Sequence, residues 1–351
     1  MIIRQANHID KELWDSYVTS KNDATPYHLF AWKNSIEESY GHRTAYLIAE
    51  ENDTVKGVLP IVSLKFPFII NVYSCLPFCD LGGVLAESQD IKRELLDAGL
   101  VLARQRHARI FEVRSPSDDF LICKELSIPF EEYTDKVNMM LKLPSSSEEL
   151  WNGFKSKLRS QIRKSEKNGL SFSWGSGEDI NAFYSVFSRN MRELGSPVHS
   201  KKFVKAIIDN YGESSRMGLV YKDNIPIGAG IILYTPAQIC IPWASTLRGY
   251  NRLAPNMLLY WNLIKYGADN GFDQFDLGRS TPNQGTYKFK VQWGAQPQPL
   301  YWYSFCLKKK AHQKINSGPS RKRELVEKIW QKLPLSAANF FGPMVRKYIS
   351  L

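Results

Sequence analysis

The sequence predicts a mixed α/β (α+β) protein of two similar lobes, each with a mixed β-sheet flanked by helices. Two observations lead to this prediction. Apolar residues make up 43% and aromatic residues 13% of the 351 positions, which is enough for the cores of two ordinary domains. In addition, one order of elements, strand–turn–strand–helix–strand, is predicted twice along the chain, which indicates two mixed α/β units.

The first copy of this unit begins with a strand at 44–50 and a turn at 51–53. The returning strand covers 56–61, and a helix is predicted at 91–106. A strand at 110–114, which ends Phe-Glu-Val-Arg, completes the unit. The first copy therefore ends at Arg114.

The second copy repeats this order with a strand at 217–221, a turn at 222–224 and a returning strand at 226–231. Its helix, at 255–270, has Pro255 in the first turn, where proline is favoured. The final strand reads Phe-Asp-Leu-Gly-Arg from residue 275. Its arginine, Arg279, is the predicted counterpart of Arg114.

The link between the lobes is predicted around residue 144, where the chain reads Leu-Pro-Ser-Ser-Ser. Ser146 or Ser147 is expected to cap a helix, and a second helix at 158–168 is expected to stop at Gly169. We therefore divide the chain into a first lobe (1–144), a second lobe (145–307) and a C-terminal tail (308–351).

The net charge of +11 is concentrated in the tail. Residues 308–351 contain eleven Lys and Arg but only Glu324 and Glu327 as acids, a local charge of +9, so residues 1–307 carry +2. Apolar residues of the tail recur at helical spacing: Leu325, Ile329, Trp330 and Leu333. Two hypotheses remain open, because such a helix suits both an anionic membrane surface and packing against the body.

Other features predict the location of the protein. The N-terminus does not resemble a signal peptide, and the apolar stretches at 67–78 and 333–345 are too short and interrupted to span a bilayer. Five scattered cysteines favour reduced thiols and a cytoplasmic location. Cys75 and Cys79 lack further ligands at metal spacing, so no metal site is expected.

Three segments are distinctive as motifs. Residues 275–295 contain Phe-Asp-Leu-Gly-Arg-Ser-Thr-Pro, Gly-Thr-Tyr-Lys-Phe-Lys and Gln-Trp-Gly-Ala, and basic 158–169 and Arg-Leu-Ala-Pro at 252–255 precede them. Together they resemble the FemAB family of GNAT-related aminoacyl and acyl transferases. The ending at 329–343 resembles the branch found with exosortase and exopolysaccharide gene clusters.

This resemblance implies tandem GNAT-like domains with a cleft between them. It implies transfer of an aminoacyl or acyl group from a carrier to an amine of a cell-envelope precursor, from peptidoglycan or exopolysaccharide. No tightly bound cofactor is expected, and the donor is a co-substrate: aminoacyl-tRNA, acyl carrier protein or acyl-CoA. The loop 247–254 contains only Gly249, too few glycines for a pyrophosphate cradle, which disfavours CoA. Arg248 and Arg252 are expected to hold a single phosphate.

Acyl transfer to an amine needs a neutral amine, a positioned carbonyl and stabilisation of the oxyanion. The sequence shows no Ser-His-Asp order, nucleophile elbow or His pair at metal spacing, which favours direct attack without a covalent enzyme intermediate. We predict catalytic roles for Lys290, Arg279 and Asp276. Lys290 would contact the carrier phosphate or the carbonyl, unless it is a surface lysine. Arg279 would bind carboxylate or phosphate, unless it forms an inter-lobe ion pair with Asp276 or Glu112.

Asp276 is expected either to act as a base or, as we favour, to orient Arg279. Asp80 is expected to line the cleft or to cap a helix. Arg114 is expected to grip the acceptor. The remaining predicted substrate-binding residues come from the motif segment: Tyr287, Lys288 and Trp293. Two other functions stay open, namely acyl-CoA-dependent N-acylation and a non-catalytic envelope-assembly scaffold that the basic tail tethers.

Overall fold

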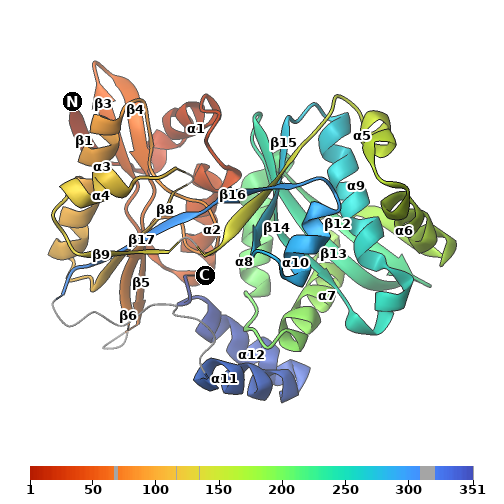
Figure 1. Ribbon diagram of the computed structural model, residues 1–351. Coiled ribbons are helices and arrows are strands. Elements are labelled where there is room, and N and C mark those ends of the chain that lie inside the picture. The colour runs from red at the N-terminus through yellow and green to blue at the C-terminus, as the bar shows by residue number, and fades with distance from the viewer. Residues whose placement is uncertain (67–69, 116, 134, 309–320, 351) are drawn as a thin grey trace.

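The structure is a computed structural model that describes residues 1–66, 70–115, 117–133, 135–308 and 321–350. Figure 1 shows two lobes side by side, with the described part of the tail beneath the second lobe. The described residues form three β-sheets with helices around them, which confirms the mixed α/β class. Part of the predicted tail, 309–320, lies outside the described residues.

The first lobe contains two sheets, with strand orders β1-β3-β4-β7 and β2-β5-β6-β8-β17-β9. Their strands are β1 (Ile2–Gln5), β2 (Arg43–Thr44), β3 (Leu47–Glu51), β4 (Thr54–Leu59), β5 (Val62–Phe66), β6 (Ile70–Ser74), β7 (Leu85–Ala86), β8 (Ile110–Ser115), β9 (Phe130–Tyr133) and β17 (Tyr301–Cys306). Its helices are α1 (Lys11–Thr19), α2 (Phe30–Tyr40), α3 (Gln89–Gln105) and α4 (Phe120–Glu125). The strand predicted at 44–50 is thus divided between β2 and β3.

The second lobe has one seven-stranded sheet in the order β11-β12-β13-β14-β15-β10-β16. Its strands are β10 (Val137–Lys142), β11 (Leu170–Gly175), β12 (Ser215–Lys222), β13 (Ile225–Tyr234), β14 (Gln238–Thr246), β15 (Gln274–Ser280) and β16 (Gln296–Pro299). Its helices are α5 (Ser147–Gly153), α6 (Ser156–Lys167), α7 (Ile180–Glu193), α8 (Lys201–Tyr211), α9 (Pro255–Asp269) and α10 (Gly285–Val291). Helix α9 packs closely on the sheet because Gly218 and Gly230 leave room for Leu263.

The two lobes repeat one local design. The β3–β4 turn has positive φ at Asn52 and Asp53 (49° and 58°), and the β12–β13 turn has it at Asp223 and Asn224 (50° and 64°). Such two-residue turns suit Asn and Asp, which tolerate left-handed backbone. In each lobe a helix, α3 or α9, then leads to a strand that pairs in parallel with an earlier one, β8 with β6 and β15 with β14. The predicted repeat is therefore present in the structure.

Each half of the chain also gives one strand to the other lobe. Strand β17, from the second half, lies between β8 and β9, whereas β10, from the first half, lies between β15 and β16. The two strand orders, β8-β17-β9 and β15-β10-β16, are equivalent. Two of the sheets therefore combine strands from both sides of the predicted boundary at residue 144. The division of the chain into a first lobe, a second lobe and a tail stays a prediction.

The lobes also share a hydrophobic core. Helices α2 and α8 pack on each other across the junction. Trp32 of α2 stacks on Trp243 of β14 at 6.4 Å, and it contacts Phe203 of α8 edge-on at 5.8 Å. One buried cluster accordingly extends from Trp14 in the first lobe to Ala295 in the second. The relative position of the lobes is thus fixed by packing as well as by strand exchange.

The tail forms helices α11 (Arg321–Lys332) and α12 (Leu335–Arg346), which both contact α7. The chain then returns between the lobes (Figure 1), where the carbonyl of Lys347 bonds His42 Nε2 at 2.7 Å and that of Ser350 accepts from Phe78 N at 2.7 Å. None of the described helices has the length and apolar character needed to cross a membrane. The tail therefore packs on the body, but Leu325 and Ile329 stay 59% and 54% exposed.

Candidate functional site

The candidate site lies where β14 and β15 diverge. Their parallel pairing covers three residue pairs and ends at Cys240 and Asp276, although β14 continues to Thr246 and β15 to Ser280. Beyond this point β15 pairs only with β10, and its backbone turns at Gly278, which has φ of +74°. A left-handed backbone at this position favours glycine. The strand end therefore presents Asp276, Gly278 and Arg279 toward the first lobe.

Asp276 is a buried carboxyl group at this fork, with only 3% exposure. Its Oδ1 accepts a hydrogen bond from Gly278 N at 2.7 Å, and Asn138 of β10 bonds its side chain. Burial raises the pKa of Asp276 to about 6, against the opposing effects of these bonds and of the Lys290 ammonium. The group therefore changes its protonation close to neutral pH.

Lys290 reaches the same point from α10. Its Nζ donates to the carbonyl oxygens of Gly278 at 2.9 Å and Arg279 at 2.8 Å, and the residue is 7% exposed. Burial lowers the pKa of Lys290 to about 8, although Asp80 and Asp276 favour the charged form. The alternative of a surface lysine is therefore wrong.

Arg279 joins the lobes through Asp80. The backbone amide of Arg279 donates to Asp80 Oδ2 at 3.0 Å, and its Nε lies 3.4 Å from Asp80 Oδ1. The predicted inter-lobe ion pair exists, but its acid is Asp80 and not Asp276 or Glu112. We predicted that Asp276 orients Arg279, and this prediction is wrong. Asp276 instead accepts a hydrogen bond from Gly278 N, and Asp80 orients Arg279. The Arg279 side chain stays 33% exposed, which leaves part of its surface accessible to a ligand.

Arg114 has a supporting position behind this pair. It is 3% exposed, donates to the carbonyl oxygens of Leu76 at 3.2 Å and Cys79 at 2.8 Å, and pairs with Glu112 at 3.4 Å. These contacts hold the loop that carries Asp80. We therefore correct the prediction that Arg114 grips the acceptor, because its guanidinium is already occupied and buried.

Trp302 of β17 is a site residue that the sequence reasoning missed. The guanidinium groups of Arg114 and Arg279 lie 5.4 and 5.2 Å from its ring, and its Nε1 donates to the Asp80 carbonyl at 3.1 Å. Such cation–π contacts hold both arginines in place. No strand was predicted at 300–306 from the sequence, and nothing in this apolar, aromatic run indicates its partner.

The other predicted binding residues differ in accessibility. Trp293 is 1% exposed and packs against Phe154 and Tyr260, so the structure places it in the core and not at a substrate surface. Tyr287 is half-buried against the same core, and Lys288 is exposed beside it on α10. Of these three, Lys288 is therefore the side chain most available to a ligand.

Arg248 and Arg252 lie on a 3-10 helix, Arg248–Leu253, directly before α9, and both are exposed. The amides of this turn are partly committed, since Tyr250 N bonds the Leu247 carbonyl and Ala254 N that of Asn251, both at 3.0 Å. It thus offers two exposed cations before α9 but few free amides for a pyrophosphate.

The buried cysteines nearby are poor nucleophiles. Cys75, Cys79 and Cys240 are all buried, and burial raises the pKa of each thiol well above its ordinary value. A thiol acts as a nucleophile only as the thiolate. These three residues are therefore structural.

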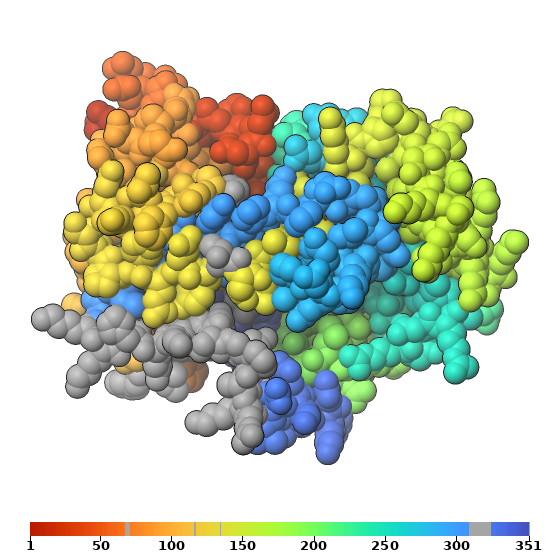
Figure 2. Space-filling model, viewed as in Figure 1, coloured from red at the N-terminus to blue at the C-terminus, as the bar shows by residue number. Residues whose placement is uncertain are grey.

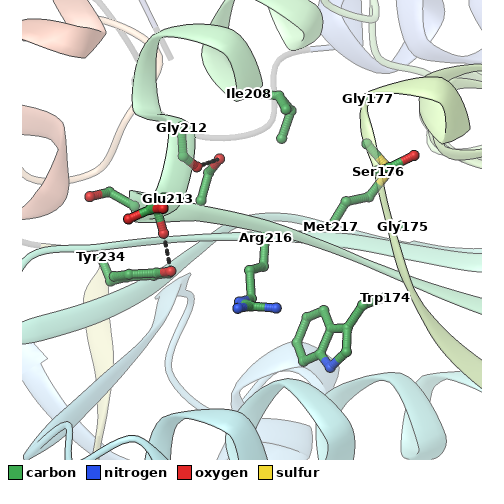
Figure 3. A pocket seen from close by; sticks show the side chains of 12 residues that line it. Trp174, Gly175, Ser176, Gly177, Ile208, Gly212, Glu213, Arg216, Met217 and Tyr234 are labelled. Carbon is green, nitrogen blue, oxygen red and sulfur yellow. Dashed lines mark hydrogen bonds between the residues drawn. The ribbon is translucent and has the colours of Figure 1, made fainter.

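A separate cavity of about 680 Å³ opens at the start of β12 (Figure 3). Arg216 points from β12 toward Trp174 of β11, and its guanidinium lies 4.8 Å from the Tyr266 ring. The hydroxyl groups of Tyr234 and Tyr266 bond this arginine. None of the ten predicted site residues lines this cavity, so it is distinct from the site at β15.

Comparison with known proteins agrees with this architecture. Residues 152–291 match the family model described as "Acetyltransferase (GNAT) domain". No curated protein matches the sequence. Among solved structures, FemX is similar with a TM-score of 0.71 at 14% identity, covering 90% of this chain and 100% of FemX.

Two further structures support the tandem arrangement. L-PGS from Bacillus licheniformis has a TM-score of 0.56 at 11% identity, covering 95% of this chain and 100% of that one. A tandem GNAT protein from the clavulanic acid biosynthesis pathway has a TM-score of 0.55 at 11% identity, covering 91% and 99%. Identities this low show the fold alone, and that fold agrees with the FemAB resemblance. The chain thus has a fold like that of these tandem GNAT-type proteins, and residues 152–291 match the GNAT acetyltransferase domain model.

Proposed function

We propose that the protein transfers an aminoacyl or acyl group from a carrier to an amine of a cell-envelope precursor. The observation that carries this proposal is the cluster of Asp80, Asp276, Arg279 and Lys290, which both lobes build at the divergence of β14 and β15. The GNAT domain match supports acyl transfer in general. The likeness to FemX and L-PGS supports an envelope precursor in general. The choice of a peptidoglycan or exopolysaccharide type rests on the sequence resemblance.

Lys290 supplies the electrostatic part of the proposed chemistry. Two of the three protons on its ammonium are directed to the carbonyls of Gly278 and Arg279, and the third is left for a ligand. A cation with so little exposure to water stabilises a developing oxyanion, or holds a carrier phosphate, more strongly than a solvated one. Arg279, positioned by Asp80 and Trp302, supplies a second cation for the same ligand.

Asp276 supplies the acid–base part. A carboxyl group with a pKa of about 6 is ionised at neutral pH and accepts the proton that the attacking amine releases. The amine attacks the carrier-bound carbonyl directly, the carrier leaves, and no acyl-enzyme forms. The protonated state of the buried thiols agrees with this order of events.

Aminoacyl-tRNA or acyl carrier protein is our first choice of donor. Acyl-CoA is the second candidate, because the matching family is one of acetyltransferases. Acyl-CoA ranks lower because backbone amides before α9 already bond carbonyl groups and the loop has a single glycine, Gly249, so few amides are free for a pyrophosphate. We place the reaction in the cytoplasm, at the inner face of the membrane, where a membrane-linked acceptor would be met.

Parallel incubation with the three donors tests the proposal. Each donor is mixed with amine-bearing peptidoglycan and exopolysaccharide precursors, and mass spectrometry detects the acylated product. We expect Lys290→Ala to lower kcat by roughly a hundredfold or more, as loss of an oxyanion-stabilising group does. Lys265→Ala, at an exposed position on α9, should have no effect. If no donor gives product, the scaffold function becomes the better explanation. If product forms and both variants behave alike, Lys290 has no catalytic role.

A further inference from the structure

The two tail helices expose large apolar side chains. On α11, Leu325 and Val326 are both 59% exposed and Ile329 is 54% exposed. On α12, Phe340 is 61% exposed, and Phe341 and Met344 are each 51% exposed. Few proteins leave so many large apolar residues uncovered on one short segment unless another surface covers them. We call the six residues the tail patch: Leu325, Val326, Ile329, Phe340, Phe341 and Met344.

The opposite faces of the same helices hold them on the body. Gly342 of α12 lies against Val198, and Ala338 of the same helix is buried. On α11, Glu327 packs against Gly195, and just beyond the helix the Leu333 carbonyl accepts a bond from Arg192 at 3.1 Å. At 100° per residue, Leu325, Ile329, Phe340 and Met344 lie across their helices from these contact positions. Val326 and Phe341 lie to the side of the contact positions. The patch is therefore an outward face of a helical hairpin that is already folded and attached.

The charge beside the tail patch is positive. Lys328 and Lys332 are exposed on α11, and residues 308–351 as a whole carry a charge of +9. Of the two acids in this segment, Glu327 faces the body. Apolar residues beside lysines are typical of helices that lie in the interface of an anionic bilayer. A protein partner of ordinary composition would not explain this excess of cations.

We propose that the hairpin of α11 and α12 docks the protein on an anionic lipid bilayer, with the tail patch entering the interface. Figure 2 shows that these helices protrude below the second lobe, where a flat surface can reach them. The inference deepens the membrane location included in the proposed function. Its test measures lipid binding and not transfer, so either proposal can fail without the other.

Docking at this face would also place the site relative to the bilayer. The chain after α12 returns to the lobe junction, where the Ser350 carbonyl accepts a bond from Phe78 N. Phe78 is two residues from Asp80, and its ring lies 5.7 Å from the guanidinium of Arg346. The docked hairpin is thus connected through one short segment to the loop that positions Arg279. A lipid-linked acceptor would then approach the site from the docked side.

Flotation on vesicles of phosphatidylglycerol and phosphatidylcholine tests the proposal with the full chain. We expect the protein to float with mixed vesicles at low salt, to float less at high salt, and not to float with phosphatidylcholine alone. The double variant Phe340→Glu/Phe341→Glu should lose at least roughly tenfold in binding, because charged groups replace inserted rings. Lys328→Glu/Lys332→Glu should weaken binding mainly at low salt.

Leu121→Glu is the matched control, since Leu121 is 73% exposed on α4, far from the tail in sequence. It should float like the wild type, and thermal unfolding should show that all variants fold. Removal of everything after Cys306 is unsuitable, because it deletes the contacts to His42 and Phe78. Equal flotation of the Phe340/Phe341 variant and the wild type, or equal binding to neutral vesicles, would overturn the proposal. So would a tail-patch variant that turns a dimer into a monomer in sedimentation while the wild type binds no lipid.

Discussion

Replacement of Lys290 by Met tests the buried cation through the pH dependence of stability. Burial lowers the pKa of Lys290 to about 8 in the folded protein, from its ordinary value of 10.5. The unfolded chain therefore binds this proton more tightly than the folded protein does. The buried charge on Lys290 lowers the free energy of unfolding by a constant amount below about pH 8. This destabilisation becomes smaller as the pH rises toward 10.5, because the folded protein releases the proton first. Lys290→Met removes this dependence.

The expected size follows from the two pKa values. Their difference corresponds to roughly 3 kcal/mol of unfolding free energy, since each factor of ten in proton affinity is worth about 1.4 kcal/mol. The wild type should therefore gain about 3 kcal/mol relative to Lys290→Met between pH 7 and pH 10.5. For a chain of 351 residues, this corresponds to a relative shift in Tm of roughly 4 °C. The carbonyls of Gly278 and Arg279 lose their donor in the variant at every pH, so that loss cancels in the comparison.

Urea unfolding of both proteins, followed by tryptophan fluorescence at several pH values, measures this relative shift. Other groups titrate alike in the two proteins, so their contributions also cancel. Lys288→Met is the control, because Lys288 is exposed on the same helix and its removal should leave the pH dependence unchanged. If the unfolding free energies of wild type and Lys290→Met differ by the same amount at every pH in this range, the pKa of Lys290 is not lowered by burial and the reasoning is refuted.

Three further predictions concern the site and the strand exchange. The rate of transfer at low substrate should rise with pH through about 6 as Asp276 ionises, and Asp276→Asn should remove this limb of the kcat/KM profile. Calorimetry should show no binding of CoA or acetyl-CoA tighter than about a millimolar, whereas micromolar binding would make acyl-CoA the first-choice donor. Phe305→Ala, in the exchanged strand β17, should destabilise the whole chain by about 3–5 kcal/mol in a single calorimetric transition. Phe66→Ala, at a position 39% exposed, should cost much less, and two separate transitions would contradict the shared fold.

Local signals in the sequence predicted much of the fold. The turns at Asn52 and Asp223 carry residues that accept positive φ, and both turns are present. Pro255 begins α9 as predicted, and Gly169 follows the end of α6 with φ of +74°. Ser146 caps α5 through a bond from Glu149 N at 3.2 Å. In each case the determinant is the conformational preference of one or two residues, which sequence reading captures well.

Pairings between distant segments were not predictable in this way. Nothing in the local pattern of β10 or β17 indicates which sheet it joins, because a strand carries the same alternation in either lobe. The sequence suggested Asp276 or Glu112, which lie on predicted strands, as the acid that pairs with Arg279. The actual partner, Asp80, comes from a loop 199 positions earlier. The burial of Arg114 and Trp293 likewise depends on tertiary packing.

The strand exchange and the candidate site are physically one feature. Strand β10 crosses from the first half to bring Asn138 to Asp276, and β17 crosses from the second half to bring Trp302 to the Asp80 loop. Each lobe thus depends on the other half of the chain for a residue that holds its acidic group. A carboxylate and an arginine on separately moving domains would meet only part of the time. Here the pairing of β10 with β15 fixes the strand that carries Arg279, and hydrogen bonds from Arg114 and Trp302 hold the loop that carries Asp80. The geometry of Asp80, Arg279 and Lys290 is therefore set by contacts of both lobes before any ligand arrives.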